Sequence, residues 1–330
     1  MQLIINDHGA FLGKRSEIFY VRMPGKPEQE FAADNVEQII IAEASSISTG
    51  AVRLAMEREI DIVYLDWRGM PVARVYPCRL GGTTLTRKRQ LESCSLPISA
   101  QIIKALVAAK IRNQAYLLKA LAKSRKNAAM NAKGDVLLLH SKKIGALGDD
   151  LEKIRGKLLG LEGYAANVYW ESLSEIIPIR SRDKEGADLA NSLLNYGYGV
   201  LYSEVEKACI IAGLDPYLGF FHSDRYGKPS MVLDMIEPFR PVIVDRAVIT
   251  LYAHRKLGDA DFTPQGEAGK RLSKEGRDKI LSAVMERLHT PISLGDTHAT
   301  LQDVILRQSR QVVKKILGDP GEFRPFIYRW

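Results

Sequence analysis

The chain has 330 residues, enough for about two domains, and its formal net charge of +8 suits a polyanionic partner without requiring one. Hydrophobic residues make up 46% and charged residues 26%, which is typical of a globular protein with a substantial core. Its three cysteines form no CxxC pair, which argues against a disulfide framework or a zinc–thiolate site. The N-terminus does not resemble a signal peptide, and no run approaches the roughly 18 apolar residues that span a bilayer. We therefore expect a cytoplasmic protein that does not involve a membrane.

The first 80 residues have the composition of a small β-rich domain. Strand-forming residues gather in five segments, at 3–5, 17–21, 36–41, 60–65 and 72–76. A single helix is predicted at 48–58, because Ser48 is a suitable N-cap and apolar residues follow it at helical spacing.

The pattern changes after this domain. Residues 81–90, which contain two glycines, are interpreted as a linker, and 91–330 as a larger all-α domain. Apolar residues with a period near 3.6 predict helices at 87–126, 151–173, 189–212, 231–257, 273–288 and 301–317. Pro238 and Pro241 are expected to interrupt the fourth of these helices, and Gly213 lies where a helix commonly ends. The predicted fold class is α+β.

Basic residues are concentrated in the first part of the predicted helical domain. Between 87 and 157 there are sixteen Lys or Arg residues against five Asp or Glu residues. Such a distribution is typical either of a solvated helix face or of a surface that follows the phosphates of DNA. The candidate DNA-binding residues are Arg87, Arg89, Lys123, Arg125, Lys126, Lys142 and Lys143.

Three segments of the helical domain contain residues suited to chemistry. Glu162 is followed by a glycine in an otherwise apolar helix, which indicates close packing or open access beside the carboxylate. His222 follows two aromatic residues in a loop. Asp234 and Glu237 are three residues apart, so they share a helix face and need a cation between them. Each residue also has an ordinary interpretation, as a surface glutamate, a packed histidine and a capping or ion-paired acid.

Taken together, these side chains form a ligand set rich in oxygen with one nitrogen. Glu162, His222 and Glu237, with Asp234 nearby, suit Mg²⁺ or Mn²⁺ with several positions open for water and phosphate oxygens. A divalent ion in such a site polarises a phosphodiester and activates a water or a 3′-hydroxyl.

The order and spacing of these motifs resemble those of the CRISPR-associated integrase family, the nuclease of spacer acquisition. The resemblance spans nearly the whole chain and rests on 162–166, 191–198, 213–222 and 233–241. It implies that Glu162, His222 and Glu237 are metal ligands and that Asp234 supports the site. It also implies a homodimer, formed largely through the N-terminal domain, that clamps a small dimeric partner, CRISPR-associated protein two.

The resemblance predicts a metal-dependent DNA endonuclease and integrase that inserts spacers into a CRISPR array by phosphodiester transesterification. Its substrates would be double-stranded DNA, namely the spacer precursor and the CRISPR repeat. A general metal-dependent nuclease on branched or single-stranded DNA, a non-catalytic DNA-binding scaffold and an RNA-processing enzyme remain alternatives. Tyr196 and Tyr198 are expected to pack in the core rather than contact DNA. The aromatic and basic tail at 323–330 is expected to dock on its own domain.

Overall fold

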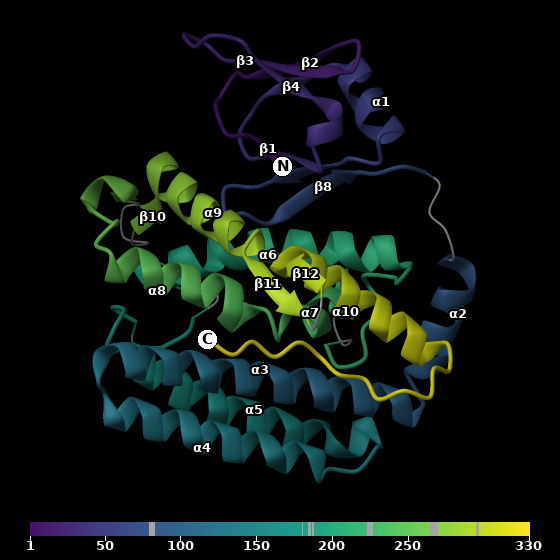
Figure 1. Ribbon diagram of the computed structural model, residues 1–330, viewed down its shortest axis with the longest axis vertical. Helices are drawn as coiled ribbons and strands as arrows, with labels where there is room; N and C mark the ends of the chain where they lie inside the picture. The colour runs from purple at the N-terminus through teal and green to yellow at the C-terminus, as the bar shows by residue number, and fades with distance from the viewer. Residues whose placement is uncertain are drawn as a thin grey trace. The chain divides into compact units, whose positions relative to one another are not determined.

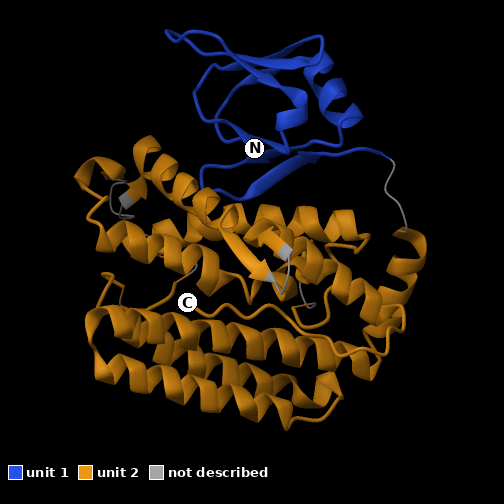
Figure 2. Ribbon diagram, viewed as in Figure 1, with its two compact units in different colours: residues 1–80 blue, residues 81–330 orange. Residues whose placement is uncertain are grey.

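The computed structural model describes residues 1–78, 83–179, 181–183, 186, 188–222, 227–264, 270–294 and 297–330. The chain divides into two compact units, residues 1–80 and 81–330 (Figure 2). The first unit is rich in strands and the second is mostly helical, which confirms the predicted α+β class.

The N-terminal unit consists of two four-stranded sheets and one α-helix. Its elements are β1 (Gln2–Ile5), β2 (Phe11–Arg15), β3 (Ile18–Arg22), β4 (Gln29–Ala32), the 3₁₀ turn Ala33–Asn35, β5 (Gln38–Ile41), β6 (Ser46–Ile47), α1 (Thr49–Glu57), β7 (Asp61–Leu65) and β8 (Pro71–Val75). One sheet has the order β1-β5-β7-β8, with β8 antiparallel to β7, and the other has the order β4-β3-β2-β6. The five predicted strands are confirmed, whereas β2, β4 and β6 were not predicted.

Helix α1 begins where the sequence predicts. The side chain of Ser48 accepts a hydrogen bond from the backbone N–H of Ala51, and so satisfies one of the donors that a helix start leaves free. Leu54 is fully buried among apolar strand residues such as Leu12 and Ile39, which make up the core of this unit.

The C-terminal unit is built from helices, with two short antiparallel strand pairs that the sequence did not predict. Its elements are α2 (Thr83–Ser93), α3 (Pro97–Arg125), α4 (Ala128–Gly145), α5 (Leu151–Leu173), α6 (Leu189–Ala212), α7 (Ser230–Ile236), a π-helical turn Pro241–Asp245, α8 (Arg246–Ala253), a 3₁₀ turn Asp259–Asp261, β9 (Phe262–Pro264), β10 (Lys270–Leu272), α9 (Lys274–Leu288), β11 (Pro291–Leu294), β12 (Thr297–Thr300) and α10 (Leu301–Ile316).

The helix predicted at 87–126 is two helices in the structure. Pro97 is the first residue of α3, and Leu96 before it is extended, as the residue preceding a proline usually is. The axes of α2 and α3 differ by 90°. Helix α2 also occupies most of the segment 81–90, where a linker was expected.

Helix α4 was missed by the sequence analysis. Its buried residues include Met130, Leu137 and Ile144, which have helical spacing. However, Val136 and Leu139 are exposed, so the apolar residues of this segment do not mark one face. In the structure α3 and α4 form an antiparallel hairpin, with α5 packed against both (Figure 1).

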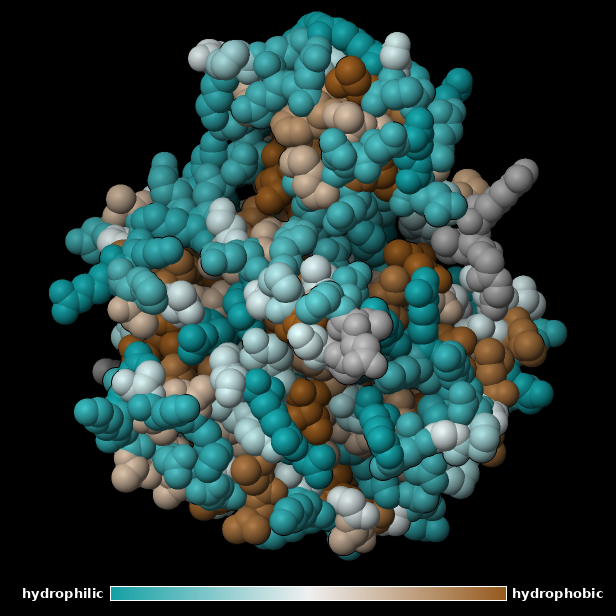
Figure 3. Space-filling view, in the orientation of Figure 1, coloured by the Kyte–Doolittle hydropathy of each residue, from teal (hydrophilic) through white to brown (hydrophobic). Residues whose placement is uncertain are grey.

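On the face drawn in Figure 3, hydrophilic residues predominate and hydrophobic residues form separate small patches. In the described part of the chain, no single helix has both the length and the apolar composition to cross a membrane. Helices α2 and α3, which are bent at 90° to one another, have this length and composition only when they are taken together.

Candidate metal centre

Glu162 lies on α5, a helix whose first turn is capped by Asp150. The side chain of Glu162 is largely buried, with 15% of its surface exposed. The neighbouring Gly163 is exposed, and an added Cβ there would meet no atom within 4 Å. Of the two interpretations of this glycine, the structure therefore supports open access and not close packing.

The loop that carries His222 is held by one carboxylate. Asp234, which is buried on α7, accepts backbone hydrogen bonds from Phe220 (2.7 Å), Phe221 (3.0 Å) and His222 (3.2 Å). Three N–H donors converging on one carboxylate fix the path of the loop, since such charge-assisted bonds are strong in a buried setting. Asp234 therefore determines where the histidine backbone lies.

Close packing on the same side adds to this constraint. Gly219 donates a hydrogen bond from its backbone N–H to Oγ of Ser230 at 2.9 Å. An added Cβ at Gly219 would lie 2.5 Å from the carbonyl carbon of Ser230, so only glycine fits here. From α5, the guanidinium of Arg155 donates to the carbonyl oxygen of Phe221 and lies over its ring. The loop is therefore joined to the helix that carries Glu162.

Asp234 also orients the imidazole ring of His222. Its Oδ1 lies 2.6 Å from Nδ1 of His222. A carboxylate accepts a hydrogen bond from Nδ1–H, and this tautomer leaves the lone pair of Nε2 for a ligand. This carboxylate–histidine pair is the arrangement that supports metal-binding histidines in general.

Glu237 lies directly after α7. Despite the proline that follows it, its backbone is helical, with φ −54° and ψ −45°. Asp234 and Glu237 thus keep helical spacing, but their present partners are different. Asp234 is satisfied by the His222 loop, whereas Glu237 faces Lys110 of α3 and Arg240.

The ammonium of Lys110 lies between two of the predicted ligands. Its Nζ is 2.5 Å from Oε1 of Glu162 and 2.5 Å from Oε2 of Glu237. Burial lowers the pKa of Lys110, but the two carboxylates outweigh burial and raise it above its ordinary value. Burial likewise opposes ionisation of Glu237, yet Arg240 and Lys110 reverse the effect and lower its pKa. Lys110, Glu237 and Arg240 are therefore charged at neutral pH.

The donor chemistry of this site fits a divalent cation. Glu237 is 4% exposed, and its Oε2 lies 2.5 Å from the ammonium of Lys110; within the described residues this oxygen has no hydrogen-bond partner besides that ion pair. A buried carboxylate oxygen that is held only by an ion pair is suited to a cation. Across the described ranges, however, no three His, Cys, Asp or Glu side chains are already gathered as a metal site. The ammonium of Lys110 holds two of the ligands in their present positions.

Asp245 is a further buried acid, and like Glu237 it lies near the guanidinium of Arg240. Asp245 ends the π-helical turn and accepts hydrogen bonds from the hydroxyls of Tyr169 (2.8 Å) and Tyr198 (2.5 Å). Burial raises the pKa of Asp245 to about 6, although the two hydroxyls and nearby arginines oppose the rise. The guanidinium of Arg240 lies over the ring of Tyr198, 4.9 Å from its centroid. Tyr198 is thus a structural residue that links Asp245 to Arg240, as the sequence analysis favoured.

The C-terminal tail supports the same region. The side chain of Asn113 donates to the carbonyl oxygens of Pro238 (2.7 Å) and Phe326 (3.2 Å), and it accepts from the backbone N–H of Tyr328 (2.8 Å). The ring of Phe326 stacks on that of Phe239, with centroids 5.8 Å apart. The prediction that the tail docks on its own domain is confirmed (Figure 1).

Sequence reasoning did not identify Lys110, Asn113 or Asp245 as parts of the site. A weak signal was present for the first two, since both are polar residues in a helix that is rich in apolar residues, but other polar residues of α3 share this property. No spacing rule connects Lys110 or Asn113 with residues that are 52 or more positions away in the chain. Asp245 lies in an apolar run next to a predicted helix break, which is a weaker signal.

The predicted DNA-binding residues are all exposed, but they are not adjacent to one another. Lys123, Arg125 and Lys126 lie at the end of α3, whereas Lys142 and Lys143 lie in the last turn of α4. Since an α-helix rises about 1.5 Å per residue, the length of α4 separates the two clusters by about 25 Å. Arg87 and Arg89 lie on α2. A DNA path over these residues stays a prediction.

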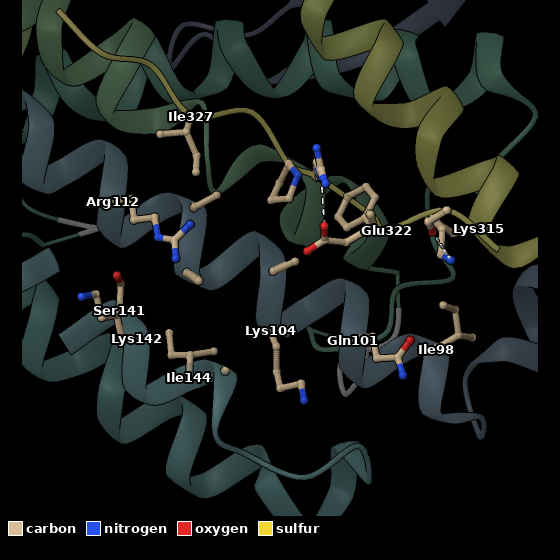
Figure 4. Close-up of a pocket in the computed structure, with 18 of the residues that line it drawn as sticks. Ile98, Gln101, Lys104, Arg112, Ser141, Lys142, Ile144, Lys315, Glu322 and Ile327 are labelled. Atoms are coloured by element: carbon tan, nitrogen blue, oxygen red, sulfur yellow. Dashed lines mark hydrogen bonds and ion pairs between the residues drawn. The ribbon is translucent and has the colours of Figure 1, made fainter. Parts of the chain in front are cut away.

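One cavity near these helices is separate from the acidic site. It has a volume of about 710 Å³ and lies between α3, α4 and the C-terminal segment (Figure 4). Its basic lining residues are Lys104, Arg112, Lys142, Lys315 and Arg324, and Lys104 is paired with Asp149 at 2.5 Å. None of the four predicted site residues lines this cavity.

The structure thus has a β-rich unit followed by a helical unit, in which two glutamates share one lysine and a buried aspartate supports a histidine. The family model described as CRISPR associated protein Cas1 matches residues 3–286, and the chain belongs to this family. A relative from Archaeoglobus fulgidus named CRISPR-associated endonuclease Cas1 1 is 30% identical, over 100% of each chain.

Two solved structures share the fold. One is described as a casposase bound to integration product; it has a TM-score of 0.85 and 24% identity, and covers 99% of this chain and 94% of that chain. The other belongs to a Cas6-RT-Cas1–Cas2 complex; it has a TM-score of 0.78 and 20% identity, and covers 100% of this chain but 36% of that longer chain. At these identities the likeness establishes the fold.

Proposed function

We propose that this chain is a metal-dependent DNA endonuclease and integrase that inserts new spacers into a CRISPR array. The observation that carries the proposal is the meeting of Glu162 and Glu237 at one cation, beside a histidine that Asp234 orients. Membership of the Cas1 family gives this cluster its context, since the full-length relative from Archaeoglobus fulgidus is named an endonuclease.

In the proposed reaction, the 3′-hydroxyl oxygen of an incoming duplex forms a new bond to phosphorus at the repeat boundary. The bond from that phosphorus to the 3′-oxygen of the repeat strand breaks, and the proton of the attacking hydroxyl ends on the departing oxygen. One phosphodiester replaces another, so no external energy source is needed.

Glu162, His222 and Glu237 would hold Mg²⁺ or Mn²⁺, which when bound supplies a Lewis acid for the phosphate oxygens. The remaining residues act by position and charge. Asp234 keeps Nε2 of His222 directed into the site, and Arg155 fixes the loop that carries the ring. Arg240 keeps Glu237 ionised. Positioning of this kind accounts for most of the catalysis expected in phosphoryl transfer.

The proposed partners follow from the family and from charge. Double-stranded DNA, as spacer precursor and as CRISPR repeat, would bind mainly through its phosphates to the exposed basic residues of the helical unit. We also propose a homodimer, formed through the N-terminal unit, that clamps a small dimeric partner, Cas2. One of the structures with this fold is named as part of a complex containing Cas2.

The proposal is tested with a supercoiled plasmid that carries a CRISPR repeat and a labelled short duplex. The purified protein is incubated with both, with and without Cas2, in the presence of Mg²⁺ or Mn²⁺. Glu162→Ala and His222→Ala serve as site variants, and Asp135→Asn, an exposed acid on α4, as a matched control. The wild-type protein and the Asp135→Asn control should transfer label into the plasmid. No label should enter the plasmid when a chelator is present or when either site variant is used.

The products also separate the alternatives. Fragments without joined strands would indicate a general nuclease on branched or single-stranded DNA. DNA binding without any reaction would indicate a scaffold, and faster cleavage of RNA than of DNA would indicate an RNA-processing enzyme. Joining that survives in both site variants would overturn the proposed site.

A further inference from the structure

The contact of Lys110 with both glutamates needs its own explanation. Lys110 comes from α3, whereas Glu162 comes from α5 and Glu237 follows α7, so the ammonium links three elements. All three side chains are largely buried, with exposed fractions of 13%, 15% and 5%. A salt bridge this far from water is costly to break by removal of one partner, because the other charge is left uncompensated.

Without the ammonium, two carboxylates would face one another with little water between them. Like charges in such a setting repel strongly, and the site would open or take up protons. Lys110 therefore keeps the two glutamates close together, as a pair of ligands for one divalent cation must be. The same ammonium also occupies the position where their oxygens converge.

A divalent cation and the ammonium compete for this position. If both stayed, three positive charges would lie together beside the guanidinium of Arg240, which is itself 3.5 Å from Glu237. The repulsion would favour release of the group that is bound more weakly, and Lys110 has a flexible stem that allows its ammonium to move.

We infer that Lys110 is the resident counter-ion of the metal-free site and is displaced from Glu162 and Glu237 when a divalent cation binds. It is a positioning residue: it preforms the ligand pair and, by competing, lowers the affinity for metal. Once released, its ammonium is a free cation at the site, of the kind that pairs with a phosphate oxygen. This inference rests on the proposed metal site.

The chain offers a closely matched control in Lys104. It lies on the same helix, its side chain has the same exposed fraction of 13%, and it is also paired with an acid, Asp149. Lys104 lines the cavity between α3 and α4 (Figure 4), and neither Glu162 nor Glu237 is among the residues that line it. Any effect of metal on Lys110 but not on Lys104 is therefore specific to the site.

The test uses the wild-type protein without DNA. A short pulse of an amine-acetylating reagent is applied with and without Mn²⁺, and the acetylation of Lys110 and Lys104 is compared by peptide mass spectrometry. Mn²⁺ binding to the same sample is measured by calorimetry. We expect Mn²⁺ to increase acetylation of Lys110 several-fold and to leave Lys104 unchanged. Unchanged or reduced acetylation of Lys110 in protein that binds Mn²⁺ would overturn the inference.

Lys110→Met provides a second, independent measurement, with Lys104→Met beside it. Loss of the competing ammonium should tighten Mn²⁺ binding by about tenfold and lower the melting temperature of the metal-free protein. Weaker or equal Mn²⁺ binding in a folded Lys110→Met variant would contradict displacement. If the wild-type protein binds no Mn²⁺ at all, the proposed metal site fails as well, whereas normal binding with no response at Lys110 removes only this inference.

Discussion

Asp234 and His222 form one structural unit, in which a single buried carboxylate holds both the ring of the histidine, at 2.6 Å, and the backbone that carries it. Replacement by asparagine tests this double role. In Asp234→Asn the amide nitrogen would face N–H donors, so the loop would lose bonds and His222 its charged partner. We expect strand transfer to fall by about 10- to 100-fold, measured with Mn²⁺ in excess. Activity equal to that of the Asp135→Asn control would show that Asp234 does not orient the histidine.

Asp245 should make stability depend on pH in an unusual direction for an acid. Its pKa in the folded protein is about 6, above the ordinary value of 3.8, so the folded state binds the proton more tightly than the unfolded state. The stabilising contribution is complete below about pH 4 and is lost as pH rises to 6 and beyond. A shift of about two units corresponds to roughly 3 kcal/mol.

The variant Asp245→Asn removes this dependence. The difference in melting temperature, variant minus wild type, should become more positive as pH rises from 4.5 to 7.5. Differential scanning calorimetry at several pH values measures it. A difference that stays constant with pH would mean that Asp245 ionises as freely in the folded protein as in the unfolded chain.

Asn113 should couple the C-terminal tail to the site. In Asn113→Ala the carbonyl of Pro238 and the backbone N–H of Tyr328 lose their partners in a buried setting. We expect a loss of about 1–3 kcal/mol in the free energy of unfolding, together with reduced activity, because Pro238 adjoins Glu237. Urea denaturation measures the first effect. The exposed Asn131→Ala variant on α4 is the control. If the two variants have the same free energy of unfolding, the hydrogen bonds of Asn113 do not couple the tail to the site.

The basic end of α3 should contribute to DNA binding through phosphate contacts. Replacing Lys123, Arg125 and Lys126 with glutamine should weaken binding and reduce the slope of log affinity against log salt by about 1–3, without affecting Mn²⁺ binding. A double variant in which Lys142 and Lys143, at the other end of α4, are also replaced with glutamine is measured in parallel. If only the double variant changes the slope, the DNA path lies at that end of the hairpin.

Local signals in the sequence were sufficient for much of the fold. Ser48, Gly213 and the 3.6-residue pattern of 151–173 identified α1, the end of α6 and α5, because capping and amphipathicity act within a few residues. Helix α4 was missed because its exposed Leu139 obscures the apolar face. The short strand β2 was missed because it contains a glycine and ends in two basic residues, and β6 was missed because it has only two residues.

The candidate site was predicted only in part. The four residues Glu162, His222, Asp234 and Glu237 stood out by type and order, and the structure brings their segments together. The cation between two of them could not be predicted, since Lys110 and Glu237 are far apart in sequence and meet only through the packing of α3 against the end of α7. In the structure Asp234 accepts hydrogen bonds from the backbone of a loop, whereas Glu237 is paired with Lys110 and Arg240; a cation shared by the two acids stays a prediction.

The central claim is that Glu162, His222 and Glu237 together bind the divalent ion. The most direct test is to soak crystals of the protein in Mn²⁺ and calculate an anomalous difference map. We predict one strong peak coordinated by all three side chains, with the ammonium of Lys110 moved away from both glutamates. A peak elsewhere, or none between these side chains at saturating Mn²⁺, would contradict the proposed site.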